Sequence, residues 1–305
     1  MGSRRRSPDL AAVEAGDGDE QEGFMKARIP EQSAGQDRWN SYGARTQEAI
    51  KQTPDKYILD AFPYHPWHDH DRYDKAISVL SPIRNKRILE LGCGSGKLSV
   101  WLAKQGAHVT GVDIGPDLLA AAQALAKVNQ VECEFRRESI TSLRFADPNT
   151  YDAAIGFAVL HHLSSGDVRK ALSECFRVLR PGGIAVFCEP VENSKLFNLV
   201  QNLVPIRTPG STRPSILQRN AWKKYVEALD DRDMTDRELI VAGAPLFRAV
   251  RVSSYGLFVR LAELAWKPDH RKRMARILVP VDRFLLKMVP PLRHYCQFAL
   301  AEYHK

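Results

Sequence analysis

The sequence of this 305-residue chain lacks the features of a membrane protein or a secreted protein. No apolar run reaches the length of a membrane span, and the N-terminal stretch lacks the apolar core of a signal peptide. Arg6 stands where N-myristoylation requires Ser or Thr. These absences argue against a spanning, secreted or acylated protein, so we expect a cytoplasmic location.

Cysteine is scarce, and its spacing does not indicate redox or metal chemistry. No Cys-x-x-Cys pair occurs, and most of the cysteines fall inside predicted strands or helices. We interpret them as small, buried, apolar residues in a reducing compartment. The five positions are Cys93, Cys133, Cys175, Cys188 and Cys296.

Metal-binding patterns are also weak. Residues 63–71 contain three histidines and two aspartates, but only one residue separates His68 from His70 and no second group of ligands lies nearby. We therefore expect no metal site. Two interpretations of this segment stay open, a polar wall of a substrate pocket or a surface loop.

Aromatic residues are nearly absent from residues 1–35, which are rich in Gly, Asp, Glu and Ser. Such a segment buries too little apolar surface to offset its chain entropy, so we predict a disordered tail. From residue 36 onward aromatic residues become frequent, which indicates a packed segment before the first strand. These residues are Trp39, Tyr42, Tyr57, Phe62, Tyr64, Trp67 and Tyr73.

The most informative stretch is Ile88–Gly96, a short apolar run that ends in three alternating glycines. Apolar residues then recur with helical spacing over residues 97–106. This pattern predicts a buried strand, a tight turn and a helix. Gly92, Gly94 and Gly96 let the backbone bend sharply and let a ligand approach it closely. The sequence therefore predicts a nucleotide-binding turn.

Two carboxylates discriminate between nucleotide ligands. Glu90 would repel a pyrophosphate at the helix N-terminus, and the Gly-x-Gly-x-Gly spacing differs from the dinucleotide fingerprint. S-adenosylmethionine fits better, because it has no phosphate and carries an ammonium and a sulfonium. Asp113 ends the next predicted strand, over residues 108–113, where an acid usually accepts hydrogen bonds from ribose hydroxyls.

Four ordered motifs resemble those of the Rossmann-like (class I) S-adenosylmethionine-dependent methyltransferases: Glu90–Gly96, Gly111–Asp113, Tyr151–Leu163 and Arg180–Gly183. The resemblance covers residues 86–190 well and the rest only in outline. It implies an α/β fold with a doubly wound, mostly parallel seven-stranded sheet that includes a final antiparallel strand. It also implies a helical N-terminal cap and a helical insertion near the C-terminus.

We accordingly divide the chain into a disordered tail (1–35), a cap (36–85), a cofactor-binding core (86–190) and a part with the substrate-specific insertion and the end of the sheet (191–305). In this division the helix after the glycine turn ends at Gly106, a suitable C-terminal cap. We predict further strands over 131–136, 151–157, 184–189, 246–255 and 295–303. Further helices are predicted from Pro116 and over 166–179, 257–265 and 277–288, with a tight turn at 180–183.

The resemblance implies a set of cofactor contacts, which includes a cap tyrosine, Tyr42, near the methionine moiety. Glu138 departs from the family pattern, because Arg137 and Glu138 replace the usual glycine and the aspartate that contacts adenine. The full set is Tyr42, Glu90, Gly92, Cys93, Gly94, Gly96, Asp113, Ile114, Glu138, Ser139 and Phe157.

His161 and His162 follow the strand predicted at 151–157, at the sheet edge where ligands of open α/β sheets bind. Positioning carries most of the catalysis of methyl transfer, and a base helps when the acceptor is a hydroxyl. Either histidine is a candidate for this base. Alternatively, one of them holds a loop carbonyl. Glu189, at the end of a later strand, either faces the substrate or caps a helix.

The sequence favours methyl transfer to a hydroxyl, or an N or C nucleophile, of a small metabolite. Nucleobase amino methyltransferases carry an Asn/Asp-Pro-Pro-aromatic motif where Gly156–Val159 stands here, so we expect no nucleic-acid substrate.

One alternative is a lipid or quinone acceptor at an anionic membrane surface. Residues 257–305 contain ten Lys and Arg against four Asp and Glu and include the two predicted amphipathic helices. Alternatively, these two helices form a lid over the pocket, with their apolar faces packed on the sheet. A cofactor-binding scaffold without an acceptor pocket is a further alternative. The oligomeric state stays open.

Overall fold

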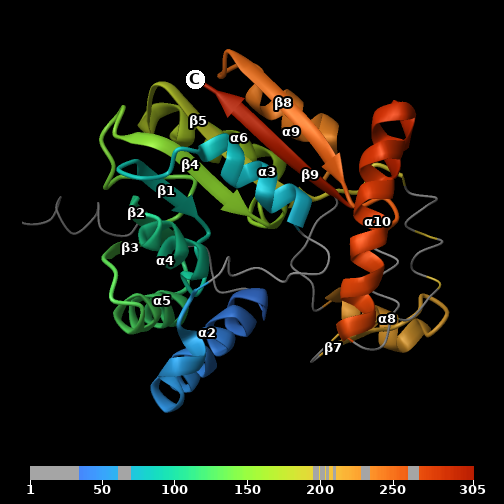
Figure 1. The fold of residues 1–305 in the computed structure, drawn as a ribbon, viewed down its shortest axis with the longest axis horizontal. Coiled ribbons are helices and arrows are strands. Elements are labelled where there is room, and N and C mark those ends of the chain that lie inside the picture. Colours follow the sequence, from blue (N-terminus) through green and yellow to red (C-terminus); the bar gives the residue numbers. More distant parts are fainter. Residues whose placement is uncertain are drawn as a thin grey trace, which may run out of the picture. The chain divides into compact units, whose positions relative to one another are not determined.

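The computed structural model describes residues 34–60, 70–194, 199, 203, 206–208, 211–227, 234–259 and 268–305. Its main feature is a seven-stranded sheet in the order β3-β2-β1-β4-β5-β9-β8 (Figure 1). The strands are β1 (Arg87–Leu91), β2 (His108–Asp113), β3 (Cys133–Arg137), β4 (Tyr151–Phe157), β5 (Leu179–Pro190), β8 (Ala249–Tyr255) and β9 (Phe298–His304).

The last strand of the chain, β9, lies between β5 and β8 and is antiparallel to both. The strands from β3 to β5 pair in parallel. This arrangement confirms the predicted doubly wound sheet with a final antiparallel strand. A separate two-stranded sheet pairs β6 (Ile206–Thr208) with β7 (Ser211–Arg213).

The described helices flank or follow these strands. The α-helices are α2 (Ala34–Gln52), α3 (His70–Leu80), α4 (Lys97–Lys104), α5 (Pro116–Val128), α6 (Ser165–Val178), α8 (Arg219–Glu227), α9 (Asp236–Gly243) and α10 (Pro268–Met288). The short 3-10 helices are η1 (Pro54–Tyr57), η2 (Leu160–His162) and η4 (Pro290–Tyr295).

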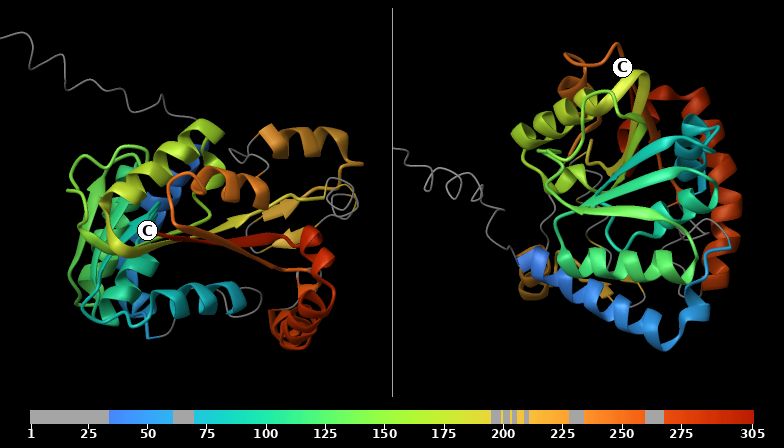
Figure 2. Two further views of the ribbon diagram at one scale, coloured as in Figure 1. Left: turned by 90° about the horizontal axis from the view of Figure 1, so that it is seen from above. Right: turned by 90° about the vertical axis from the view of Figure 1, so that its left-hand side faces the viewer.

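Side-chain alternation along β1 separates the core into two layers. Ile88 packs with Leu80 of α3 and Leu98 of α4 on one face of the sheet. Leu89 packs on the other face in a cluster that includes Leu172 of α6 and residues of α9. Helices α6 and α9 therefore cover one face of the sheet and α3 and α4 cover the other (Figure 2).

The cap helix α2 packs against α5, and Ile50 shares a buried cluster with Leu125. The contact is closest at Gly43, where a Cβ atom would lie 2.5 Å from the carbonyl carbon of Asp117. Asp117 is in the first turn of α5, directly after the carboxyl end of β2. The N-terminal half of α2 thus lies beside the edge where the glycine turn is found.

Three predicted segments differ from the structure. Leu257 and Phe258, the first residues of the helix predicted at 257–265, are bends, because the carboxylate of Asp282 accepts hydrogen bonds from their N–H groups. Residues 260–265 of that prediction lie outside the described ranges. The amphipathic stretch predicted at 277–288 is the second half of the longer α10. The last strand begins at Phe298, since the paired prolines at the start of η4 favour a helical turn there.

A smaller difference concerns the predicted turn at Arg180–Gly183, which is an irregular part of β5. Leu179 pairs with Tyr151, the register then shifts, and Ile184 pairs with Ala153. The predicted disordered tail lies outside the described residues, apart from Ala34 and Gly35, which begin α2. None of the helices in the described ranges is long and apolar enough to cross a bilayer.

Candidate functional site

The glycine turn joins the ends of β1 and β2. The N–H groups of Gly92 and Cys93 both donate to the carbonyl oxygen of Val112, at 2.8 and 3.0 Å. The N–H of Gly96 then donates to the carbonyl of Cys93 at 2.9 Å, which closes the turn before α4 begins. The turn therefore lies at the carboxyl edge of the sheet, where the sequence places it.

The glycines of this turn differ in what surrounds them, although all three have positive φ angles. A Cβ atom on Gly96 would lie 2.6 Å from the Cβ of Ala122, and one on Gly92 would lie 2.5 Å from Val159. A Cβ on Gly94 would meet no protein atom within 4 Å. Close packing explains the first two glycines, whereas Gly94 exposes the backbone to open space that a ligand can enter.

Asp113 connects the glycine turn to the start of α5. Its carboxylate accepts hydrogen bonds from the N–H of Gly94 at 2.9 Å and from the N–H of Gly115 at 2.8 Å. Burial raises the pKa of the Asp113 carboxyl, while these two N–H groups oppose the shift. The carboxylate is thus held in one orientation beside the open space at Gly94.

Glu90 lies beneath the same turn and is buried. Its carboxyl group accepts a hydrogen bond from the hydroxyl of Ser99 in α4. Burial raises the pKa of Glu90 to about 8, with Ser99 opposing the shift and the charge of Asp113 adding to it. At neutral pH this carboxyl is therefore mostly protonated, so its charge cannot by itself repel a pyrophosphate in the ligand-free protein.

Cys93 is a packed residue of the turn. Its thiol is buried, and burial raises its pKa well above the ordinary value, with the charges of Glu90 and Asp113 adding to the effect. Such a thiol stays protonated and unreactive. Within the described ranges none of the five cysteines forms a disulfide, and four of them are buried, in agreement with their interpretation as apolar packing residues.

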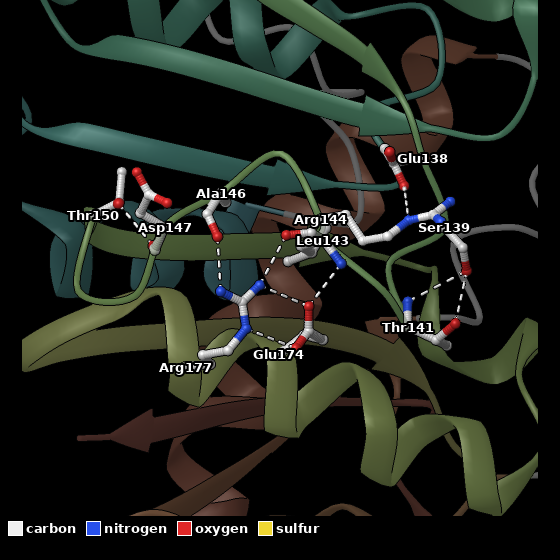
Figure 3. Close-up of polar contacts among 10 residues, drawn as sticks. All are labelled: Glu138, Ser139, Thr141, Leu143, Arg144, Ala146, Asp147, Thr150, Glu174 and Arg177. Carbon is white, nitrogen blue, oxygen red and sulfur yellow. Dashed lines mark hydrogen bonds and ion pairs between the residues drawn. The ribbon is translucent and has the colours of Figure 1, made fainter. Parts of the chain in front are cut away.

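Glu138 and Ser139 follow β3 at the same edge. The N–H of Glu138 donates to the carbonyl of Asp113 at 3.2 Å, and its carboxylate lies 4.0 Å from Nε of Arg144. The Oγ of Ser139 is 2.8 Å from the hydroxyl of Thr141 (Figure 3). Both residues are thus positioned next to Asp113, with their side chains engaged in local contacts.

The loop after Ser139 is fixed by α6. The guanidinium of Arg177 donates to the carbonyls of Leu143 and Ala146, at 2.8 and 2.7 Å, and pairs with Glu174 (Figure 3). Glu174 in turn accepts from the N–H of Leu143 at 2.7 Å. These contacts hold the segment that carries Glu138 against the sheet.

The two candidate histidines lie in η2, after β4, in different environments. His161 is buried, and its Nδ1 lies 2.8 Å from Oε2 of the fully buried Glu189. The ring of His162 is exposed and its centre lies 4.0 Å from that of His161. Both histidines follow the carboxyl end of β4, the edge of the sheet at which the glycine turn also lies.

Glu189 also accepts hydrogen bonds from the backbone N–H groups of Val159, Leu160 and His161, at 3.1, 3.0 and 3.3 Å. It therefore acts as a cap for η2, one of the two roles that the sequence left open. Its position at the end of β5 gave no signal of the contact with His161, because the two residues are 28 positions apart.

Phe157, Ile114 and Tyr42 complete the predicted set. Phe157 ends β4 and packs edge-on against Tyr73 of α3, with ring centres 4.6 Å apart. Ile114 directly follows Asp113 and is exposed. Tyr42 is 38% exposed, with its ring against Trp39.

Asn40 is a site residue that the sequence analysis missed. Its Oδ1 is shielded from solvent and has no hydrogen-bond partner within the described part of the chain. A Cβ atom built on Gly115 would lie 3.0 Å from this oxygen and 3.3 Å from Oδ1 of Asp113. Asn40 therefore faces the Asp113 site from α2. The only signal in the sequence is its place in the aromatic cap segment.

No group of three or more His, Cys, Asp or Glu side chains in the described ranges is arranged to hold a metal ion. Most of the histidine-rich segment, including His68, lies outside those ranges, so the structure does not test that segment.

Residues 89–187 match the family described as methyltransferase domain. The ubiquinone biosynthesis O-methyltransferase of Hahella chejuensis is 31% identical over 177 residues, which are 53% of this chain and 71% of that protein. A putative methyltransferase from a Geobacillus species is 34% identical over 47% of this chain and 56% of its own length. This chain thus spans between about half and 71% of such relatives.

The crystal structure of an S-adenosylmethionine-dependent methyltransferase from Archaeoglobus fulgidus has the same fold, with a TM-score of 0.51 and 15% identity over 77% of this chain and 92% of that one. Together with the ordered motifs of the glycine turn, Asp113 and the β4 edge, these matches establish the identity. The chain belongs to the Rossmann-like, class I S-adenosylmethionine-dependent methyltransferases.

Proposed function

We propose that this methyltransferase acts on a hydroxyl group of a small metabolite, with His162 as the base. The observation that carries the proposal is the exposed His162 imidazole at the carboxyl edge of β4, with its ring centre 4.0 Å from that of His161, which Glu189 holds in place. An O-methyltransferase among the relatives supports the choice of a hydroxyl acceptor.

The residues of the glycine turn fit S-adenosylmethionine. Asp113 would accept hydrogen bonds from the ribose hydroxyls, since it lies beside the open space at Gly94. Glu90 would lose its proton when a cation binds nearby, because an opposite charge favours the carboxylate. When bound, this cofactor supplies an electrophilic methyl group on a sulfonium.

The protein contributes mainly position and a proton acceptor. Glu189 orients His161 through the Nδ1 contact, and the ring of His161 packs on that of His162. His162 would accept the hydroxyl proton as the acceptor oxygen attacks the methyl carbon in line. Holding the reacting groups in this alignment removes much of the entropic barrier.

Formation of S-adenosylhomocysteine in the presence of fractionated metabolite extracts tests this proposal. A hydroxylated, water-soluble metabolite should support turnover. Mass spectrometry after deuterium exchange should show that the methylated product has one exchangeable proton fewer than this metabolite. An acceptor whose methyl group ends on nitrogen or carbon would overturn the hydroxyl assignment.

A second candidate is a lipid or quinone acceptor at an anionic membrane surface, and the exposed face of α10 favours it. Ala275, Val279 and Asp282 of this helix face the protein. The opposite face carries an apolar stripe with exposed fractions of 66, 40, 63 and 62%: Ile277, Val281, Phe284 and Met288. Exposed Arg273, Arg276, Arg283 and Lys287 lie along one side of it. This is the pattern of a helix that lies in a membrane interface.

Sedimentation with vesicles separates the two candidates. Binding should rise with the content of anionic lipid and fall as salt is added. Phe284→Gln should weaken vesicle binding. Leu217→Gln should not, because it changes an apolar residue that is 75% exposed but lies outside α10. Equal binding to neutral and anionic vesicles would leave the soluble metabolite as the acceptor.

A further inference from the structure

A cavity of about 620 Å³ lies between α3, the end of β8 and α10. Neither the glycine turn nor the two histidines of η2 line it. Its volume is in the range of sites for small molecules, so it can accept a ligand of its own.

The cavity has a cationic wall. Lys75 of α3, Arg283 and Lys287 of α10, and Arg293 of η4 line it, together with two carboxylates, Asp74 and Asp282. Cations therefore outnumber carboxylates in the lining.

Some of these charged groups already have partners. Asp282 is buried and accepts hydrogen bonds from the N–H groups of Leu257, Phe258 and Val259, at 3.0, 2.8 and 3.1 Å. Lys75 lies 3.7 Å from Glu302, which is outside the lining. The side chains of Lys287 and Arg293 form no hydrogen bond or ion pair within the described ranges, so both can bind an anion.

The rest of the lining combines apolar and hydroxyl groups. Tyr255, Val279 and Leu286 supply apolar surface, and Ser78 and Ser253 supply hydroxyl groups. A ligand that fits these walls has an apolar body and one strongly anionic group.

We infer that this cavity binds a molecule that carries a phosphate group on an apolar body. The forked donors of Arg293, the ammonium group of Lys287 and the hydroxyl groups match a tetrahedral anion with several acceptor oxygens. The phosphate could belong to a lipid headgroup or to a soluble phosphomonoester, because both present the same chemistry. The inference does not rest on methyl transfer.

Calorimetric titration of the full chain with hexyl phosphate, a soluble probe, tests the inference. Lys287→Ala and Arg293→Ala should each weaken binding about tenfold or more, since each removes a charge-assisted contact. Arg273→Ala changes an exposed cation of the same helix outside the lining and should leave the affinity unchanged. Lys287 and Arg293 are exposed, so circular dichroism should show unchanged folding.

Vesicles that contain phosphatidic acid distinguish the two sources of phosphate. The cavity is assigned to a lipid headgroup if hexyl phosphate gives no heat and if vesicle binding depends on Lys287 and Arg293 but not on Arg273. The cavity is assigned to a soluble phosphomonoester if hexyl phosphate gives a heat of binding and the two lining variants reduce it. Equal losses in all three variants, or no binding of either probe, would overturn the inference.

Discussion

Glu189 fixes the imidazole of His161, since its Oε2 lies 2.8 Å from Nδ1 and both side chains are buried. The same carboxylate accepts three backbone N–H groups at the start of η2. This arrangement leaves the exposed His162 as the candidate base that we propose. The two adjacent histidines thus have different environments, which the sequence alone does not distinguish.

Glu189→Ala should lower the free energy of unfolding by about 3 to 5 kcal/mol, because it leaves several buried donors without an acceptor. Urea unfolding measures the change. Glu132→Ala, which alters an exposed glutamate just before β3, should stay within about 0.5 kcal/mol of the native protein. A loss from Glu189→Ala no larger than that of the control would contradict the capping role.

His162→Ala should lower kcat about 100-fold or more, because it removes the proposed base from an exposed position. Initial rates with the identified acceptor measure the effect. His108→Ala replaces an exposed histidine at the opposite end of β2 and should retain full activity. Unchanged turnover in the His162 variant would remove this residue from the reaction.

Asp113→Asn should weaken the binding of S-adenosylhomocysteine by about 2 kcal/mol or more, because charge-assisted contacts with the ribose hydroxyls are lost. The amide oxygen can still accept a hydrogen bond from one of the two N–H groups that fix this side chain, so the fold should persist. Calorimetry gives the affinity, with Asp117→Asn in the exposed first turn of α5 as the control. Native affinity in the Asp113 variant would refute the ribose assignment.

Glu90 should make both stability and cofactor affinity depend on pH. Its pKa is raised from 4.5 to about 8 in the folded protein, so as pH rises the unfolded chain loses this proton at a lower pH than the folded protein does. The stabilising effect of the neutral carboxyl is therefore present below pH 4.5 and is lost as pH rises toward 8. Glu90→Gln should raise the melting temperature of the cofactor-free protein at pH 8.

The same residue predicts proton release on binding. If a cation of the cofactor lowers the pKa of Glu90, affinity for S-adenosylmethionine should increase between pH 6.5 and 8.5 and this increase should disappear in Glu90→Gln. Calorimetry in buffers of different ionisation enthalpy counts the released protons. A pH-independent affinity in the native protein would show that Glu90 does not sense the cofactor.

Asn40→Ala should weaken the binding of S-adenosylhomocysteine about fivefold to tenfold, because its unpaired Oδ1 faces the Asp113 site and would accept a hydrogen bond there. The melting temperature without ligand should not fall, since no contact of that oxygen within the described ranges is lost. Gln52→Ala, at the other end of α2, provides the control. A lower melting temperature with unchanged affinity would make Asn40 a packing residue.

The sequence by itself determined the first two strands of the sheet, the glycine turn and the position of Asp113, whereas the seven-stranded sheet was implied by the family resemblance. These features depend on local patterns, namely apolar runs that end in glycine and acids that directly follow strands. The patterns over residues 88–96 and 108–113 therefore correctly predicted the two strands, the turn between the first strand and its helix, and the edge of the sheet at which the turn lies.

Only the tertiary structure decided the roles of individual side chains. The pairing of His161 with Glu189, the raised pKa of Glu90 and the approach of Asn40 to Gly115 depend on burial and on contacts between segments far apart in the chain. The exposed stripe of α10 is a similar case, because apolar spacing shows that a face exists but not whether another element covers it. Packing, rather than local sequence pattern, determines these properties.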